Sequence, residues 1–153
     1  MIDSFSGRWS FLSNFYPVKI THLGIEYPSV EHYYVALKIK SDQLINGIQM
    51  NYMDCREYIS RIPTPGAAKR FGRKLSLRKD WDLVKLDVME YGLKQKFQNE
   101  DLKDMLLSTG DQELIEGNTW HDNFFGTCNC YKCGNKGENH LGKLLMKIRE
   151  SLK

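Results

Sequence analysis

The sequence lacks the features that mark membrane-spanning, exported and repetitive proteins. No long apolar run occurs, so no transmembrane helix is predicted. The first ten residues, MIDSFSGRWS, do not show the basic-then-apolar pattern of a signal peptide. Internal repeats and low-complexity segments are also missing. We therefore expect no membrane partner and a cytoplasmic location, where thiols stay reduced.

A strong charge of one sign is missing too. The net charge is +3 and the isoelectric point is about 8.6, which permits a phosphate-bearing ligand without requiring nucleic acid. The chain has 153 residues, of which 41% are hydrophobic and 27% charged. These values predict one globular domain over residues 1–153 that buries a proper core.

The stretch Ser29–Lys40, SVEHYYVALKIK, is predicted to be a helix with Ser29 as its N-cap. Glu31 and Lys38 are seven residues apart, so they point the same way, about 10 Å apart along the axis. Tyr34 lies between them on the same side. Such a helix can present a carboxylate and an amine to one ligand. The alternative is a solvated charge pair on an amphipathic helix.

The other elements predict an α+β class that is predominantly helical. Val18 to Tyr27 alternates apolar and polar residues around Leu23-Gly24, as in a β-hairpin. A short strand is expected at Leu114-Ile115. Helical composition or spacing occurs at residues 54–59 and 67–77, from Asp80 to Phe97, after Asn99, and at residues 141–152. The result is a mostly helical domain with a small β-sheet.

Residues 116–126, EGNTWHDNFFG, are too polar to be explained by packing alone. Asn118 and Asp122 stand among Trp120, Phe124 and Phe125, between the expected strand and the last helix. An amide, a carboxylate and flat rings suit recognition of a ribose and a base. A surface turn with two buried rings would explain the stretch equally well.

Six blocks, in this order along the chain, resemble the YbiA-like proteins, also called the NADAR family. They are FLSNFYP (11–17), YPSVEHYYVALK (27–38), AKRFGRKL (68–75) with RKDWDLVK (78–85), LLSTG (106–110), EGNTWHDNFFG (116–126) and NHLGKLLMKIRE (139–150). The resemblance runs from about residue 8 to the C-terminus. It implies a single, mostly helical YbiA-like domain with a few short strands.

The resemblance also implies an activity. Members of the family cleave N-glycosidic bonds. Some hydrolyse phosphoribosylated intermediates of riboflavin synthesis, and others remove ADP-ribose from guanine in nucleic acid. We therefore expect a hydrolase, an N-glycosidase, whose substrate is ADP-ribosylated DNA or RNA or a phosphoribosylated small molecule. The sequence does not indicate an oligomeric state.

Site residues follow from the same resemblance. The family's helix glutamate and lysine fall on Glu31 and Lys38, and Asp122 is the second candidate for the catalytic carboxylate. The residues expected to contact substrate are Asn14, Phe15, Tyr34, Arg73, Trp81, Asn118, Trp120, Phe125 and Gly126. Two departures from the family pattern occur. Phe125 replaces a usual Trp, and CNCYKCGNKGE replaces a Gly-rich stretch before the last helix.

Breaking a ribosyl–nitrogen bond builds positive charge on the anomeric carbon, which a carboxylate such as that of Glu31 stabilises. Two roles remain open for Lys38. It can hold a phosphate or protonate the leaving base, or it can attack C1 of the opened sugar and form a Schiff base. Arg73 lies in the most basic part of the chain, which is either a solvated helix face or a phosphate-binding patch.

Three of the four cysteines, Cys128, Cys130 and Cys133, lie within six residues. With His121 or His140 as a fourth ligand they would form a zinc site, which we expect to be structural. Free cysteines in a polar loop are the alternative. The glycosidase chemistry requires no cofactor. Besides the two N-glycosidase substrates, a non-enzymatic zinc-bearing module that binds nucleotides or nucleic acid, and an enzyme acting on free NAD or ADP-ribose, remain open.

Overall fold

A computed structural model describes all residues, 1–153, and confirms the predominantly helical α+β class. The chain divides into two compact units, Asn14–Lys96 and Met1–Ser13 with Phe97–Lys153. In place of one small sheet there are three two-stranded sheets. None of the helices combines the length and the apolar content that crossing a membrane requires.

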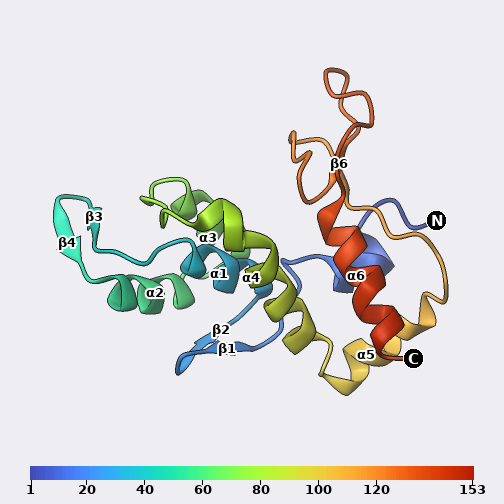
Figure 1. The fold of residues 1–153 in the computed structure, drawn as a ribbon, viewed down its shortest axis with the longest axis horizontal. Coiled ribbons are helices and arrows are strands. Elements are labelled where there is room, and N and C mark those ends of the chain that lie inside the picture. The colour runs from blue at the N-terminus through green and yellow to red at the C-terminus, as the bar shows by residue number, and fades with distance from the viewer. The chain divides into compact units, whose positions relative to one another are not determined.

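Helix α1 (Val30–Leu37) is the centre of the unit Asn14–Lys96, and all eight of its residues are buried. It packs against α2 (Tyr52–Ser60), α3 (Pro65–Gly72) and α4 (Trp81–Lys96), as Figure 1 shows. Two glycines allow this packing. A Cβ at Gly72 would lie 3.1 Å from a methyl carbon of Val35, and one at Gly92 would lie 2.8 Å from the ring of Tyr33. Helix α1 therefore has no solvated face, and the alternative of an amphipathic helix is wrong.

Both ends of α1 are held by polar side chains. The Ser29 hydroxyl accepts from the backbone N–H of His32, as an N-cap should. His32 also hydrogen-bonds through Nε2 to the carbonyl of Ile62, at 2.9 Å. At the other end, the buried guanidinium of Arg56 donates to the carbonyls of Ala36 and Ile39, at 3.0 and 2.8 Å. These bonds hold the turn that ends at Lys38. The positive charge of Arg56 adds to the effect, because a cation is favourable at the C-terminus of a helix.

Two hairpins flank these helices. Strands β1 (Ile20–His22) and β2 (Ile25–Tyr27) pair antiparallel around Leu23-Gly24, as predicted, and both turn residues have positive φ. The sequence prediction missed the second hairpin, β3 (Gln43–Ile45) with β4 (Ile48–Met50). Its turn is Asn46-Gly47, a dipeptide that strongly favours a two-residue hairpin turn and would have identified it.

Helix α3 ends at Gly72, five residues earlier than the sequence predicted. The reason lies in Gln43, a buried side chain outside the helix. Its amide accepts from the backbone N–H of Ser76 at 2.8 Å and donates to the carbonyl of Ser76 at 3.1 Å. Tertiary hydrogen bonds thus replace the helical ones in this segment.

The other unit contains a 3-10 helix, η1 (Gly7–Leu12), helix α5 (Glu100–Ser108) and helix α6 (His140–Ser151). Asn99 caps α5 and Gly110 follows it at φ +64°, both as predicted. Helix α6 buries Leu141, Leu145 and Ile148. The expected strand at Leu114-Ile115 is only an isolated bridge to Ile2. The strand lies slightly later, where β5 (Gly117–Asn118) pairs in parallel with β6 (Thr127–Cys128).

Lys96, at the end of α4, is a buried amine. Its side chain is 0% exposed, its Nζ lies 5.8 Å from the ring centre of Tyr16, and burial lowers its pKa to about 7. In the unfolded chain an exposed lysine keeps a pKa of about 10.4. Between these values the unfolded state binds one proton more than the folded state, so Lys96 makes stability rise with pH.

We expect Lys96→Met to remove this pH dependence. Urea unfolding at pH 7, 8 and 9 should show a wild-type free energy of unfolding that rises faster than that of the variant, by up to about 1.4 kcal/mol per pH unit. Lys94→Met is the matched control, because Lys94 lies exposed on the same helix in an ion pair with Glu90. Equal slopes for Lys96→Met and wild type would contradict the prediction.

Candidate active site

Three predicted site residues lie together on α1 and at its end. Glu31 is 9% exposed, Tyr34 is buried, and Lys38 is the half-buried C-cap of the helix. The Lys38 Nζ lies 5.5 Å from the ring centre of Tyr34, within the range of a cation–π contact. The helix thus presents a carboxylate and an amine from a packed, rigid element.

Lys38 has an unusual electrostatic environment. Burial lowers its pKa from the ordinary value of a lysine, and this is the largest effect. The negative charge of Glu31 acts in the opposite direction, whereas the positive charges of Lys69 and Arg73 lower the pKa further. More of the amine is therefore neutral near pH 7 than in an exposed lysine, and a neutral amine is the form that attacks a carbon atom.

Trp81, at the start of α4, packs on Tyr34 with ring centres 5.0 Å apart. Both rings are buried. Each ring therefore has little surface open to a ligand, and contact of Trp81 with substrate stays a prediction.

Asn14 lies at the other end of α1, and its carbonyl oxygen accepts the backbone N–H of Glu31 at 3.1 Å. The Asn14 side chain is buried. Its Nδ2 donates to the sulfur of Met89 at 3.5 Å, and its Oδ1 has no hydrogen-bond partner. A buried acceptor without a donor costs about 1–3 kcal/mol. Contact of this side chain with a hydroxyl of the substrate stays a prediction.

Phe15 is 41% exposed and lies near the first turn of α3, with the Lys69 Nζ 6.0 Å from its ring centre. An exposed ring on a rigid element can stack on a base. Arg73, the exposed C-cap of α3, belongs to the basic stretch that the sequence indicated. This part of the chain combines stacking surface with positive charge.

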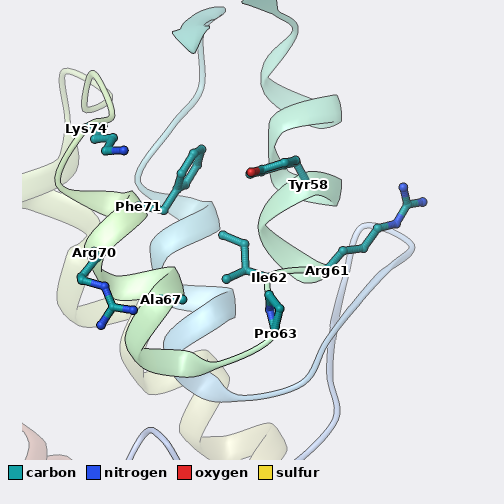
Figure 2. A pocket seen from close by; sticks show the side chains of 8 residues that line it. All are labelled: Tyr58, Arg61, Ile62, Pro63, Ala67, Arg70, Phe71 and Lys74. Carbon is teal, nitrogen blue, oxygen red and sulfur yellow. The ribbon is translucent and has the colours of Figure 1, made fainter. Parts of the chain in front are cut away.

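A groove lies between the end of α2 and α3, with a volume of about 610 Å³ (Figure 2). Its lining joins two rings, Tyr58 and Phe71 at 5.1 Å, to three basic side chains, Arg61, Arg70 and Lys74. The remaining lining residues are Ile62, Pro63 and Ala67. Sequence reasoning singled out the charges of α3 but missed Tyr58 and Arg61, because only the turn between α2 and α3 brings these side chains beside α3.

The loop Glu116–Gly126, in the other compact unit, is held by its own polar side chains. Asn118 is buried, its Nδ2 donates to the carbonyl of Asp122 at 2.9 Å, and its Oδ1 accepts from the N–H groups of Trp120 and Asp122. The side chain of Asn118 therefore maintains the shape of the loop. Contact of this side chain with substrate stays a prediction.

Asp122 also organises the loop. Its Oδ1 accepts from the N–H groups of Phe124 and Phe125, at 3.2 and 3.0 Å, as in an Asx turn. Phe124 and Phe125 are half-buried and pack edge to face, whereas Trp120 is 57% exposed. The alternative of a turn with two buried rings thus describes the phenylalanines only in part and does not describe Trp120.

Close packing of two backbone segments explains why residue 126 is a glycine. A Cβ at this position would lie 2.3 Å from the carbonyl oxygen of Glu116, so only glycine fits between the two segments.

A cluster of one histidine and three cysteines adjoins the loop. The ligand atoms of His121, Cys128, Cys130 and Cys133 all lie within 4.8 Å of one another and could hold a metal ion. His140, the other candidate for the fourth ligand, is not part of this cluster. It pairs with Glu138 and packs on Phe124.

Comparisons with known proteins identify the family. The NADAR domain model matches residues 4–153, which includes all but the first three residues of the two compact units. N-glycosidase YbiA of Escherichia coli K12 is 36% identical over 154 residues, covering 97% of this chain and 85% of that protein. An N-glycosidase of Nostoc punctiforme is 38% identical, covering 92% of this chain and 84% of that protein.

Two further matches agree with these. A riboflavin biosynthesis protein of Vibrio vulnificus is 37% identical over 93% of this chain, which corresponds to 35% of that longer protein. The NMR structure of E. coli YbiA superposes with a TM-score of 0.73 at 33% identity, covering 99% of this chain and 86% of that one. The resemblance noted in the sequence is confirmed. This chain belongs to the NADAR domain family.

Proposed function

We propose that this protein is an N-glycosidase that removes ADP-ribose from modified guanine in nucleic acid. N-glycosidase chemistry is the activity for which its relatives in E. coli and N. punctiforme are named. The observation that carries the proposal is the partly buried Lys38 amine, placed on α1 with the carboxylate of Glu31 and held at a lowered pKa. An amine and a carboxylate in that state are the groups that cleavage of a ribosyl–nitrogen bond requires.

The proposed reaction proceeds through a Schiff base. With the sugar ring open, C1 is joined to the base nitrogen as an imine. The neutral Lys38 Nζ adds to C1, and one of its protons moves to the base nitrogen. The bond from C1 to the base nitrogen then breaks. That nitrogen keeps the electron pair and takes up the second proton of Nζ, so the base leaves as the free amine and C1 is joined to Nζ as an imine. Water then adds to the new imine, the C1–Nζ bond breaks, and ADP-ribose leaves with the oxygen of the water.

In this scheme Glu31 stabilises the positive charge that develops at C1 and transfers the protons. The route requires a base nitrogen that carries a hydrogen, so that the ring can open. The exocyclic amine of guanine meets this condition. No metal ion takes part, so the cluster at His121 has a structural role in the proposal, and catalysis needs no cofactor.

The groove of Figure 2 favours a polymeric substrate. Three basic side chains, Arg61, Arg70 and Lys74, line it together with the rings of Tyr58 and Phe71. Single strands are typically bound by positive charge along the backbone and by rings on which bases stack. We propose that residues 1–153 act as one NADAR domain, and that the substrate is ADP-ribosylated DNA or RNA in the cytoplasm.

A second substrate has its own support. The relatives in V. vulnificus and maize are named riboflavin biosynthesis proteins. Phosphoribosylated intermediates of that pathway also join a ribosyl carbon to an amine, and the same two residues would cleave them.

A time course on single-stranded DNA that carries ADP-ribosylated guanine tests the proposal. We expect the mass spectrum to show free ADP-ribose and restored guanine. Turnover of phosphoribosylated riboflavin intermediates without release from DNA would favour the second substrate. Turnover of free NAD or ADP-ribose alone would contradict both. If none of these substrates is turned over, the protein is a binding module and the proposal is wrong.

A separate prediction concerns binding of the oligonucleotide in the groove. We expect the double variant Arg61→Ala/Arg70→Ala to raise the KM for the modified oligonucleotide and to leave kcat/KM for a modified mononucleotide unchanged. The slope of log affinity against log salt should become less steep, by about 0.7 for each phosphate that the protein no longer neutralises. Lys19→Ala, an exposed lysine paired with Glu26 outside the groove, is the control. An unchanged oligonucleotide KM and salt slope would show that the groove does not hold the strand.

A further inference from the structure

The cluster of His121, Cys128, Cys130 and Cys133 has the dimensions of a tetrahedral metal site. The His121 Nδ1 lies 3.3 Å from the sulfur of Cys133, 3.4 Å from that of Cys130 and 3.8 Å from that of Cys128. Bond lengths of about 2.3 Å for Zn–S and 2.0–2.1 Å for Zn–N place ligand atoms roughly 3.5–3.8 Å apart around one ion. The three nitrogen–sulfur distances are thus close to those around a zinc ion, and the whole set, within 4.8 Å, needs only a small contraction to bind one.

Hydrogen bonding does not account for this arrangement. The His121 Nδ1 carries at most one hydrogen, yet three sulfur atoms surround it. One N–H cannot satisfy three thiols, and further packing would not bring four polar atoms to one point. A cation bound to three thiolates and a neutral imidazole satisfies all four groups together.

The backbone is shaped for the same purpose. Cys130 and Cys133 have the C-x-x-C spacing of a zinc-binding turn, and the N–H of Gly134 donates to the carbonyl of Cys130 at 3.0 Å. Gly134 has φ +61°, so the chain reverses directly after the second cysteine. Figure 1 shows this turn extending beyond β6, away from α6.

Asn123 supports the sulfur atoms from outside the cluster. Its Nδ2 lies 3.6 Å from the sulfur of Cys133, and its Oδ1 accepts the N–H of Cys128 at 3.2 Å. Amide donors directed at thiolates are a common outer support of zinc sites.

We propose that these four residues bind one Zn²⁺ ion, and that the ion fixes the loop Gly117–Gly126. Three thiolates and one imidazole complete a tetrahedral shell, which is typical of structural zinc and leaves no position for substrate. The link to the loop is direct. His121 stands between Trp120 and Asp122, and β5 pairs Asn118 with the zinc ligand Cys128.

The backbone of His121 shows why the loop needs the ion. Its φ is +68°, a left-handed conformation that is strained for a non-glycine residue. A metal bond to the side chain offsets this strain and holds the next residue, Asp122, in place. Without the ion, the turn at His121 keeps the hydrogen bonds of Asn118 and Asp122, and the rest of the loop keeps its backbone bonds to β6 and to the start of α6.

The first measurement is the metal content of the full chain after purification without added metal. We expect one zinc per chain by mass spectrometry of the elements. Replacing the ion with Co²⁺ should give the visible absorption of a tetrahedral thiolate site. A chain that retains no zinc after incubation with excess ion and gel filtration, and that gives no cobalt spectrum, would overturn the proposal.

Cys133→Ser and His121→Ala should each lose the zinc and the cobalt spectrum. Cys55→Ala is the matched control, because Cys55 is a free thiol buried in α2 and outside the cluster. Zinc retained at full stoichiometry by both cluster variants would overturn the assignment of the ligands. These variants can fail to fold, so chelation of the wild-type protein provides a second test.

Hydrogen exchange before and after chelation measures the effect on the loop. The N–H of Asp122 is hydrogen-bonded within the loop, and those of Thr127 and Asn129 donate to the carbonyls of Glu116 and Asn118. We expect these three N–H groups to exchange about tenfold faster or more without zinc. The amides of α1 serve as the internal control and should not change. Added zinc should restore protection. Equal exchange with and without zinc would overturn the loop-fixing role, and this outcome does not depend on which substrate is cleaved.

Discussion

Replacing Glu31 by Gln is expected to lower kcat for N-glycosidic cleavage by about 10²–10⁴-fold while KM stays close to that of the wild type. Glutamine keeps the size and the hydrogen-bonding shape of the side chain. It removes the negative charge that stabilises the developing cation at C1, and it cannot transfer a proton. The loss therefore falls on the transition state and spares binding.

Initial rates on the modified oligonucleotide, with product measured by mass spectrometry, provide the test. Glu26→Gln is the control, because Glu26 is an exposed carboxylate on β2 that pairs only with Lys19. A Glu31→Gln variant with a kcat near that of the wild type would assign the catalytic carboxylate elsewhere. Asp122 is the next candidate, and Asp122→Asn would then be measured in the same way.

Lys38→Ala is expected to abolish turnover, and sodium borohydride should link the opened sugar to the wild-type protein during the reaction. Reduction of the Schiff base gives a stable amine, which peptide mass spectrometry should locate at Lys38. Lys40→Ala, two residues later and exposed, should keep both activity and labelling. Full activity of Lys38→Ala would remove this residue from the mechanism. Loss of activity without labelling of the wild type would favour the role in protonating the base or holding a phosphate.

The pH profile tests the state of the same amine. A neutral Lys38 is the attacking form, so kcat/KM should rise with pH through its pKa, below the range of an ordinary lysine. The positive charges of Lys69 and Arg73 lower that pKa. Arg73→Met removes one of them and should move the midpoint of the profile to higher pH. A midpoint that is unchanged or moves to lower pH would show that Lys38 is not the group that titrates.

Local patterns in the sequence were sufficient for many elements. Ser29 and Asn99 cap the helices that they were expected to cap, and Leu23-Gly24 forms the predicted hairpin turn. Each prediction depends on residues within one or two turns of each other, where dihedral preferences and capping act. The end of α3 was predicted wrongly because a side chain distant in the sequence, Gln43, binds the backbone at Ser76.

Some features of the candidate site were also predictable from local sequence patterns, and others were not. Sequence patterns alone led to Glu31 and Lys38 on one side of a helix, and to three cysteines close enough for a metal. They offered His121 or His140 for the fourth ligand, and folding of the loop brings His121 to the sulfur atoms. They also missed the groove, whose lining joins Tyr58 and Arg61 of one segment to the charges of another.

Helical spacing was thus enough to put a carboxylate and an amine on the same side of α1. Whether that helix would be exposed to solvent or buried depended on packing between segments far apart in the chain. Gly72 and Gly92 let α3 and α4 approach α1 closely and enclose it. Removing water from Lys38 disfavours its charged form and lowers its pKa. The order of residues supplied the two groups, and tertiary packing set the electrostatic environment of the amine.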